Sequence, residues 1–480
     1  MDQSKFIKTF DKLDKVSQRR YIEFLDSPYF NKNEEVRQFV ALIRQGKASQ
    51  DPKKIYEFLY PGKPFDARRL HDLLYKSLKL LEEFLTEEQY ATQTWDRKLN
   101  LLNYIRVNEL EDLNSVVQRE IRELSAKKQF RDSNYFYEEF MYQSEAYKIF
   151  LDQAQIKGDE NLQKKVDRLD LFYLSAKLRD SCEMMNRKRI LSIDYEFHLL
   201  NNLIEAIKAD FERYKSYPAI SIYYRILLML MEPEDTGHFR KLQEEFQQNI
   251  GLFPQDEQRS LYGYLQNYCI RKVNSGAAAF YSELFDIYEH MLLIGLMDPD
   301  NKNLQWELKN MVSVALRLGK YERALDIVET LKTRLPEEVS ENAYAYNLAN
   351  YYYETKNFRK ATLLLHSVDF KDVYYNLDSK SMLLKIYFEQ DEEEAFFALV
   401  NTFQVFLTRN RLISTDTHLA YSNLLKFARK AFVFKTMLPY QRRHSSHKIR
   451  TLNDKLTRSK NVINLAWLLK ETDKLMEDAQ

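Results

Sequence analysis

The sequence predicts an all-α protein in which helical hairpins stack into an α-solenoid behind a compact helical N-terminal module. Helix breakers are scarce: the 480 residues include nine glycines and ten prolines, and no proline lies between Pro64 and Pro218. From residue 217 onward, helical hairpins recur at about 34 to 45 residues, which is the period of helical repeats. Because each repeat buries its apolar face on its neighbour, a chain of this length needs no single large core.

Residues 1–90 are expected to form the N-terminal module. Its predicted helices span Phe6–Leu25, Glu35–Arg44 and Pro52–Leu59, and a fourth helix follows Asp66, whose carboxylate can accept hydrogen bonds from the free N–H groups. The basic side chains of the fourth helix leave two roles open, contact with DNA phosphates or a structural cap for the solenoid. These side chains are Arg68, Arg69, His71, Lys76 and Lys79.

Residues 91–216 are predicted to form long helices that pair in hairpins without a clean sequence repeat. Asp132 and Ser133 are suitable N-caps for one of these helices. The expected helices span Thr94–Val107, Leu110–Leu124, Asn134–Gln153, Asn161–Met185 and Tyr195–Tyr214.

Residues 217–430 are predicted to form the solenoid. Its first hairpins pair Pro218–Met231 with Thr236–Gln248, and Asp256–Val273 with Ala277–Ile294. From Trp306 to Leu407, three turns then share a pattern in which a small residue follows inside the second helix. These turns are Leu318–Ala324, Thr355–Ala361 and Glu389–Ala395.

The segment from Trp306 to Leu407 resembles the tetratricopeptide repeat, a helix–turn–helix unit of about 34 residues. The small residues Ala324, Ala361 and Ala395 would let the second helix approach the first closely, and Tyr321 and Phe358 would wedge beneath the turns. Gly319 can take a left-handed conformation at the end of the helix, and Pro336 stands where the second helix must stop. The resemblance implies a right-handed solenoid, although the family pattern is incomplete in the third copy, where Glu392 replaces the aromatic residue.

In the tetratricopeptide family, the first helices of successive repeats line a concave groove for peptides. Lys309 and Asn347 match two positions of the family's carboxylate clamp, whereas other clamp positions do not match. The alternative is that the residues corresponding to the groove only pack neighbouring helices together. The resemblance maps the partner-binding groove onto Lys309, Ser313, Arg317, Tyr346, Asn347, Asn350, Tyr353, Lys380 and Tyr387.

Residues 431–480 are predicted to hold a basic segment and a C-terminal capping helix over Val462–Met476. Between residues 426 and 460, eleven lysines and arginines stand against one acid, Asp454. Such a segment can neutralise phosphates, so nucleic-acid binding is the alternative function. The opposing interpretation is a solvated basic face or a partner for the acidic run Asp391–Glu394. The candidate anion-binding residues are Arg442, Arg443, Lys448 and Arg450.

Several classes of site and location are not expected. The sequence has no Gly-rich phosphate loop, nucleophile elbow or carboxylate–histidine helix motif, so we expect no enzyme, no cofactor and no small-molecule substrate. The pair His444 and His447 lies among cations, which disfavours a metal ion. No signal peptide or membrane span is expected, and Cys182 and Cys269 are expected to be buried thiols, which is typical of a cytoplasmic protein.

These patterns lead to a functional hypothesis. The sequence predicts a non-enzymatic helical-repeat scaffold or adaptor that binds a protein or peptide partner on its concave face. The alternative is a nucleic-acid-binding or regulatory protein that uses the basic C-terminal stretch or the N-terminal module.

Overall fold

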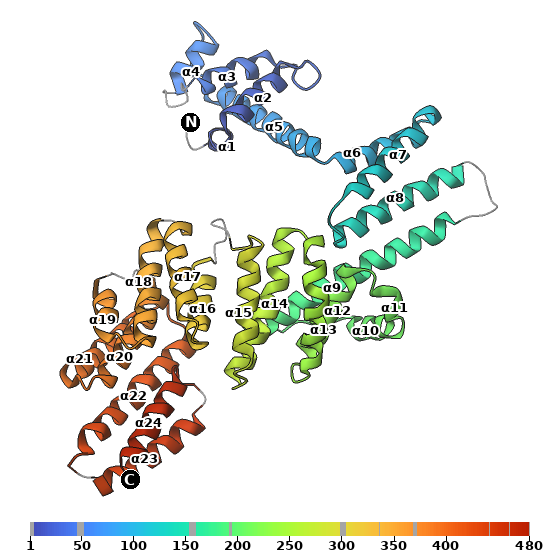
Figure 1. The fold of residues 1–480 in the computed structure, drawn as a ribbon. Coiled ribbons are helices and arrows are strands. Elements are labelled where there is room, and N and C mark those ends of the chain that lie inside the picture. The colour runs from blue at the N-terminus through green and yellow to red at the C-terminus, as the bar shows by residue number, and fades with distance from the viewer. Residues whose placement is uncertain are drawn as a thin grey trace. The chain divides into compact units, whose positions relative to one another are not determined.

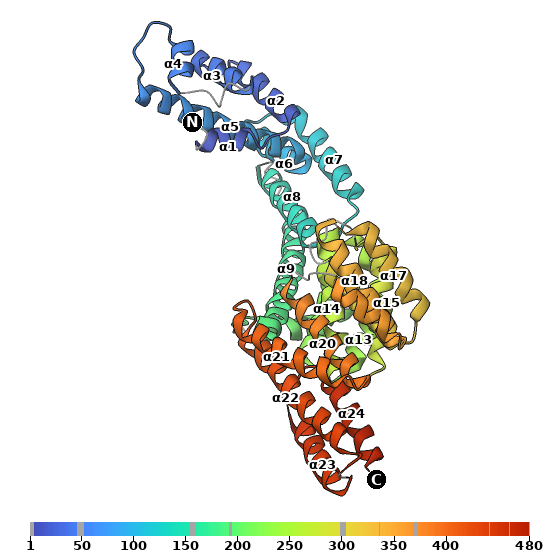
Figure 2. The same ribbon diagram turned by 90° about the vertical axis from the view of Figure 1, so that its left-hand side faces the viewer.

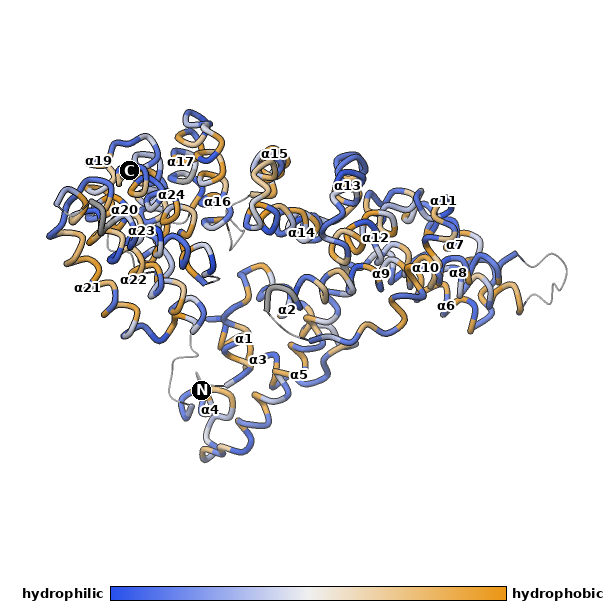
Figure 3. Tube along the Cα trace, turned by 90° about the horizontal axis from the view of Figure 1, so that it is seen from below, coloured by the Kyte–Doolittle hydropathy of each residue, from blue (hydrophilic) through white to orange (hydrophobic). Residues whose placement is uncertain are grey.

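The computed structural model is helical in every regular element that it describes, which confirms the predicted all-α class (Figure 1). Hydrophobic and hydrophilic positions alternate along the helices (Figure 3), as expected where each helix buries one apolar stripe. The described residues are 4–45, 52–152, 160–191, 194–297, 304–335, 337–367, 372–440, 442–459 and 461–479.

The chain divides into two compact units. The first comprises Met1–Leu227 and Glu244–Phe253, and the second comprises Leu228–Gln243 and Pro254–Gln480. The division into four segments expected from the sequence stays a prediction.

The first unit begins with five helices that share an apolar core. Tyr21 is fully buried there, and its hydroxyl donates a hydrogen bond to the Ser77 carbonyl oxygen at 2.8 Å. The predicted N-cap Asp66 is confirmed, because its carboxylate accepts from the N–H groups of Arg68 and Arg69. The five helices are α1 (Lys5–Phe10), α2 (Lys15–Asp26), α3 (Glu34–Arg44), α4 (Pro52–Leu59) and α5 (Ala67–Thr92).

The single helix predicted over Phe6–Leu25 is wrong, because α1 and α2 are separate helices. A second start signal interrupts the chain. Asp14 caps α2 by accepting a hydrogen bond from the Ser17 N–H at 2.6 Å, and an N-cap residue itself lies outside the helix.

The remaining helices of the first unit agree with the sequence in most places. Asp132 is confirmed as an N-cap, since it accepts from the Tyr135 N–H at 2.9 Å. The helix predicted over Tyr195–Tyr214 is wrong at its start and is broken at Asp210, which separates α10 from α11. The helices are α6 (Thr94–Val107), α7 (Glu111–Lys127), α8 (Ser133–Asp152), α9 (Asn161–Leu191), α10 (Leu200–Ala209), α11 (Phe211–Tyr214), α12 (Pro218–Met231), α13 (Thr236–Asn249) and the short η2 (Ile250–Leu252), with α12 and α13 contributing to both units.

The second unit continues with consecutive helices that pack as neighbours. Near its C-terminus, α22, α23 and α24 pack against one another (Figures 1 and 2). The helices are α14 (Gln255–Asn274), α15 (Phe280–Leu293), α16 (Leu304–Arg317), α17 (Tyr321–Arg334), α18 (Glu337–Glu354), α19 (Phe358–Ser367), α20 (Val373–Glu389), α21 (Glu393–Arg409), α22 (Thr415–Met437), α23 (Arg442–Arg458) and α24 (Leu465–Asp478).

The three repeated turns share one backbone geometry. Gly319, Lys356 and Asp391 all have positive φ, at 71°, 61° and 59°. In each turn, the N–H of the next residue bonds to a carbonyl oxygen five positions earlier, for example Lys320 to Ala315 at 2.9 Å. This pattern is the Schellman ending of a helix, so the left-handed conformation predicted for Gly319 is confirmed.

The side chains around these turns agree with the sequence only in part. Ala324 and Ala361 are fully buried, as predicted, but Tyr321 is 40% exposed and does not wedge beneath its turn. Phe358 packs on Tyr353 with a ring separation of 5.7 Å. In the third repeat, Phe396 is the fully buried residue instead of its neighbour alanine. The expectation for Pro336 lies outside the described residues.

Both cysteines are buried free thiols, as predicted. Burial raises the pKa of Cys269 to about 12 and raises the pKa of Cys182 well above its ordinary value. Neither sulfur is therefore a reactive thiolate near neutral pH.

The conformation of Gly319 can be tested against that of Gly263, which lies inside α14. A Cβ atom added at either position meets no atom within 4 Å, so only the backbone differs. We expect Gly319→Ala to lower the free energy of unfolding by about 1 kcal/mol, because its φ of +71° is unfavourable for alanine. Gly263→Ala is expected to raise it by roughly 0.5 to 1 kcal/mol. Urea unfolding of both variants would check this, and a stabilising Gly319→Ala would contradict it.

Candidate functional site

The candidate site lies on the first helices of the three repeats. Helix α16 packs against α18, and α18 packs against α20. Leu308, Met311 and Ala315 of α16 are fully buried. The polar side chains of Lys309 and Ser313 contact the neighbouring helices α20 and α18. We name the surface where side chains of these three helices meet the α16–α18–α20 face.

Lys309 occupies one end of this face and is surrounded by aromatic rings. Its Nζ atom lies 5.1 Å from the ring centroids of Trp306 and Tyr346 and 5.2 Å from that of Tyr375. The rings also pack on one another, with Trp306 stacked on Tyr375 at 4.9 Å. Lys309 forms an ion pair with Asp378, and these side chains are 14% and 29% exposed. Cation–π attraction and the ion pair together hold the ammonium group in place.

Asp378 connects this cluster to a further helix. Its other carboxylate oxygen accepts a hydrogen bond from the Tyr421 hydroxyl of α22 at 3.0 Å. Burial, with the Asp378 charge nearby, raises the pKa of both Tyr346 and Tyr421 above the ordinary value. Both hydroxyls therefore stay protonated at neutral pH.

In the middle of the α16–α18–α20 face, the hydrogen bond between side chains of α16 and α18 is long. The Asn350 side-chain amide lies 3.5 Å from the Ser313 hydroxyl, which itself donates to the Lys309 carbonyl oxygen. Asn347 is fully buried, and its amide donates to the Ala343 carbonyl oxygen at 2.8 Å. Asn347 is thus enclosed by helix packing, whereas Asn350 and Ser313 stay half-buried.

Glu389 organises the other end of the face. Its carboxylate accepts hydrogen bonds from the Tyr353 hydroxyl at 2.5 Å and the Trp467 indole at 3.1 Å, and Lys356 pairs with it at 3.1 Å. Burial alone would raise the pKa of Glu389, but the hydrogen bonds from Tyr353 and Lys356 lower it below its ordinary value. Because Trp467 belongs to α24, the C-terminal helix reaches the third repeat, as its predicted capping role requires.

Lys385 lies between the two ends and has few contacts. Its Nζ atom lies 4.7 Å from the Tyr353 ring centroid, and no hydrogen bond or ion pair joins it to the residues that the structure describes. Burial lowers the pKa of Lys385 to about 8, and the charges of Glu354 and Glu389 oppose that decrease. Lys385 is therefore a half-buried amine whose donors are not used within the described chain.

The structure places two predicted groove residues elsewhere. Lys380 lies 5.4 Å from the Phe406 ring of α21, and the Tyr387 hydroxyl contacts His366 of α19 at 2.9 Å. Both therefore lie on the side of α20 that faces α19 and α21, away from the Asp378 side. Of the remaining predicted residues, Arg317 is exposed at the end of α16. Partner binding by the predicted residues stays a prediction.

Sequence reasoning missed three charged residues of α20. Asp378 and Glu389 hold this helix in the face, and Lys385 lies between them. Their spacing of i, i+7 and i+11 places them on one side of a helix, and α20 is otherwise mostly apolar. The alignment to the tetratricopeptide pattern instead assigned the groove to Lys380 and Tyr387, which lie on a different side of α20. Charged residues that share one side of an apolar helix were the usable signal.

The predicted anion-binding residues are only partly described. Lys448 and Arg450 are exposed on α23, and the side chains of Arg442 and Arg443 lie outside the described residues. Lys435, from the same basic stretch, pairs with Asp391 at 2.6 Å. The alternative role of the stretch as a partner for the acidic run is thus confirmed for this one residue.

Two basic side chains of α5, Arg69 and Lys79, form ion pairs within the N-terminal module. Arg69 pairs with Glu35 at 2.6 Å and stacks on the Tyr60 ring at 4.1 Å, and Lys79 pairs with Glu82 at 2.6 Å. These contacts lower the charge available for DNA phosphates on this helix.

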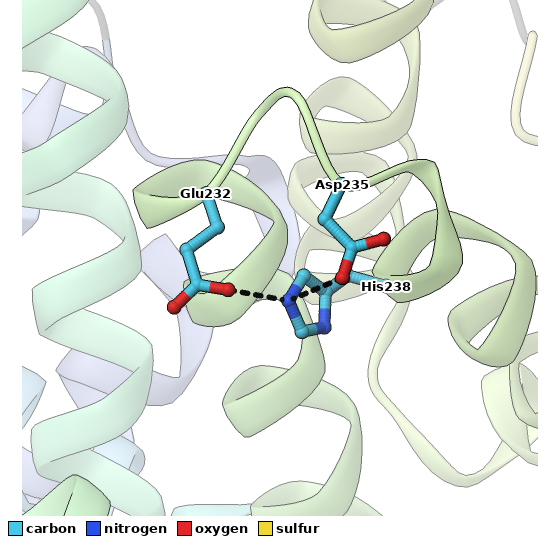
Figure 4. Close-up of side chains that lie close together, drawn as sticks. All are labelled: Glu232, Asp235 and His238. Atoms are coloured by element: carbon cyan, nitrogen blue, oxygen red, sulfur yellow. Dashed lines mark hydrogen bonds and ion pairs between the residues drawn. The ribbon is translucent and has the colours of Figure 1, made fainter.

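Three side chains at the turn between α12 and α13 form a group that could hold a metal ion (Figure 4). His238 Nε2 lies 2.9 Å from Glu232 Oε2 and 3.5 Å from Asp235 Oδ2. Asp235 Oδ1 also accepts from the Gly237 N–H at 2.8 Å near the start of α13. Closing the turn accounts for the positions of all three side chains without a bound ion.

No family model, curated protein or solved structure matches this chain. Among the helices that the structure describes, none has the length and apolar character needed to cross a membrane.

The role of Asp378 can be tested by removing the carboxylate. We expect Asp378→Ala to lower the free energy of unfolding by about 2 to 3 kcal/mol, because Lys309 would remain largely buried without a counter-charge. The double variant Lys309→Met with Asp378→Leu removes both charges and should recover at least about half of that loss. Urea unfolding would measure both, and equal losses in the two variants would contradict a paired arrangement.

Lys385 gives a prediction about pH. Below the folded-state pKa of about 8, both the folded and the unfolded protein carry the proton, so the folded state bears the full cost of burying the charge. We expect Lys385→Met to raise the free energy of unfolding by roughly 2 kcal/mol at pH 7. This gain should shrink as pH rises from about 8 to 10.5, because the lysine is neutral in both states only above that range.

The matched control is Lys360→Met, which changes an exposed lysine on α19. Urea unfolding at pH 7 and at about pH 10 would compare the two variants with the unmodified chain. A Lys385→Met gain that is the same at both pH values would show that burial of its charge is not the cause.

Proposed function

We propose that the chain is a non-enzymatic helical-repeat scaffold or adaptor that binds a protein or peptide partner along the α16–α18–α20 face. The observation that carries the proposal is Lys385, a half-buried amine with unused donors between two ordered clusters. Exposed Arg317 and half-buried Asn350, whose amide has a long contact of 3.5 Å with the Ser313 hydroxyl, extend this row of polar groups. A preorganised face with a few unsatisfied donors is suited to a partner that offers carbonyl or carboxylate oxygens.

A right-handed tetratricopeptide-like solenoid is part of the proposal. Successive first helices pack against one another, and the three turns between paired helices end in the same left-handed geometry. Burial of Ala324 and Ala361 supports close approach of the paired helices. In such an array the first helices would line one continuous surface.

The experiment is photo-crosslinking of the full chain in extracts of its native cell. A benzoylphenylalanine placed at Arg317 should capture a partner that the same group at Arg359, an exposed residue of α19, does not capture. The captured protein is then purified for a binding measurement with the unmodified chain.

We expect Arg317→Ala combined with Asn350→Ala to weaken binding of that partner by about tenfold, because two polar contacts at the face are lost. The paired control is Arg359→Ala, which should leave the affinity unchanged. Equal affinity for the double variant and the unmodified chain would remove this face as the binding surface.

A second candidate function is nucleic-acid binding by α23. Lys448, Arg450 and Lys455 are exposed, and among the described residues none of them forms an ion pair. Replacing all three with Glu should abolish retention of the full chain on immobilised single-stranded RNA at low salt. Retention that survives this change would exclude α23 as the contact.

A further inference from the structure

Helices α21 and α22 enclose a pocket of about 490 Å³ that shares no residue with the α16–α18–α20 face. A pocket of this size can take one or two side chains of a ligand. Its lining combines apolar, amide, hydroxyl and basic groups. The lining residues are Val400, Asn401, Gln404, Ser422, Leu425, Lys426, Arg429, Lys430, Val433 and Phe434.

Aromatic contacts on both sides explain why the pocket exists. Phe396 stacks on Phe432 at 4.3 Å toward one end, and Phe403 packs on Tyr421 at 5.9 Å toward the other. These large rings set the separation of the two helices. Val400, between the two phenylalanines of α21, is too small to fill the space that the rings leave.

The basic side chains at the pocket have no counter-charge among the acidic residues that the structure describes. Lys426, Arg429 and Lys430 are all exposed, and their i, i+3, i+4 spacing places them together on α22. Within the described residues none of the three forms an ion pair, although Arg429 lies 5.9 Å from the Phe397 ring centroid. Lys435, further along the same helix, is by contrast neutralised by Asp391. The pocket therefore presents three neighbouring positive charges.

Neutral polar groups complete the lining. The Ser422 hydroxyl oxygen is buried and has no hydrogen-bond partner among the residues that the structure describes. A buried hydroxyl that lacks a partner costs about 1 to 3 kcal/mol, so a ligand that reached it would gain a favourable contact. Asn401 and Gln404 add exposed amides from α21, opposite the basic side chains.

We propose that the pocket between α21 and α22 binds an acidic peptide segment of a partner protein. One apolar side chain of the segment would rest on Val400, Leu425 and Val433, while flanking carboxylates would pair with the three cations of α22. The amides of Asn401 and Gln404 would meet the peptide backbone.

The lining favours a peptide over single-stranded nucleic acid. Binding of bases requires open aromatic ring faces for stacking, and the one ring in this lining, that of Phe434, is half-buried. The aliphatic floor suits a leucine-sized side chain, and the amides suit backbone groups.

The test uses the full chain and a fluorescein-labelled peptide, Glu-Asp-Glu-Leu-Glu-Asp-Glu, with fluorescence anisotropy at low salt. The triple variant Lys426→Glu, Arg429→Glu, Lys430→Glu should weaken binding by about tenfold or more. The matched control Lys5→Glu, Lys12→Glu, Lys15→Glu makes the same change in net charge at exposed positions of the N-terminal module and should leave the affinity within about twofold. A probe with Ser in place of Leu should bind several-fold more weakly.

A charge-preserving variant separates the pocket from general electrostatics and from loss of fold. Asn401→Trp places a large ring over the pocket at an exposed position and should also weaken the peptide by about tenfold. Circular dichroism would verify that each variant stays helical, and if the triple variant unfolds, Asn401→Trp decides the result.

Three outcomes would overturn the proposal. The first is equal weakening by the two triple variants, which would indicate diffuse charge attraction. The second is a peptide affinity that Asn401→Trp leaves unchanged. The third is tighter binding of a ten-nucleotide single-stranded RNA that is lost with the α22 variant, which would assign the pocket to nucleic acid. Arg317→Ala with Asn350→Ala should not affect this probe, so the pocket and the α16–α18–α20 face can fail independently.

Discussion

The packing of the second unit depends most on the contacts of the Asp378 carboxylate. This carboxylate pairs with Lys309 of α16 and accepts a hydrogen bond from Tyr421 of α22, so a single residue of α20 connects three helices. A largely buried charge is stable only when its partner is in place, which limits how far these helices can slide along one another. The stacked rings of Trp306 and Tyr375 lie beside the Lys309 ammonium group of the pair.

Glu389 repeats this arrangement at the other end of α20. It collects a hydroxyl, an ammonium and an indole N–H, the last from the C-terminal helix. Both ends of α20 are held by satisfied carboxylates, whereas Lys385 between them has no ion-pair partner in the described part of the chain. An ordered surface with one unused donor binds with less loss of side-chain entropy than a flexible surface does.

The pocket on α21 and α22 differs from the α16–α18–α20 face in its charge. Its three cations have no counter-charges among the described residues, so attraction there depends on these local charges and should weaken with salt. The α16–α18–α20 face holds charges of both signs and would depend instead on hydrogen-bond geometry. The two proposed binding surfaces therefore differ in their chemistry.

The helices were predictable wherever one start signal and one stop signal bracket an apolar stripe. Helices α4, α6 and α12 have the predicted bounds, and Asp66 and Asp132 cap their helices as expected. Prediction failed where a second cap lies inside a periodic segment, as Asp14 does. The left-handed conformations of Lys356 and Asp391 were also not predicted, because these residue types, unlike glycine, do not indicate a positive φ.

The sequence by itself determined the all-α class, the repeated turns and the burial of Ala324, Ala361 and both cysteines, because these depend on local propensity and on spacing along one helix. Only the tertiary structure decided which side of α20 meets α16 and α18. That choice rests on contacts between residues far apart in the chain, such as Lys309 with Asp378. The sequence pattern of α20 fits two neighbouring alignments to the repeat, so it does not decide between these sides. The pocket between α21 and α22 was decided the same way, because the space beside Val400 depends on how the rings of two helices pack together.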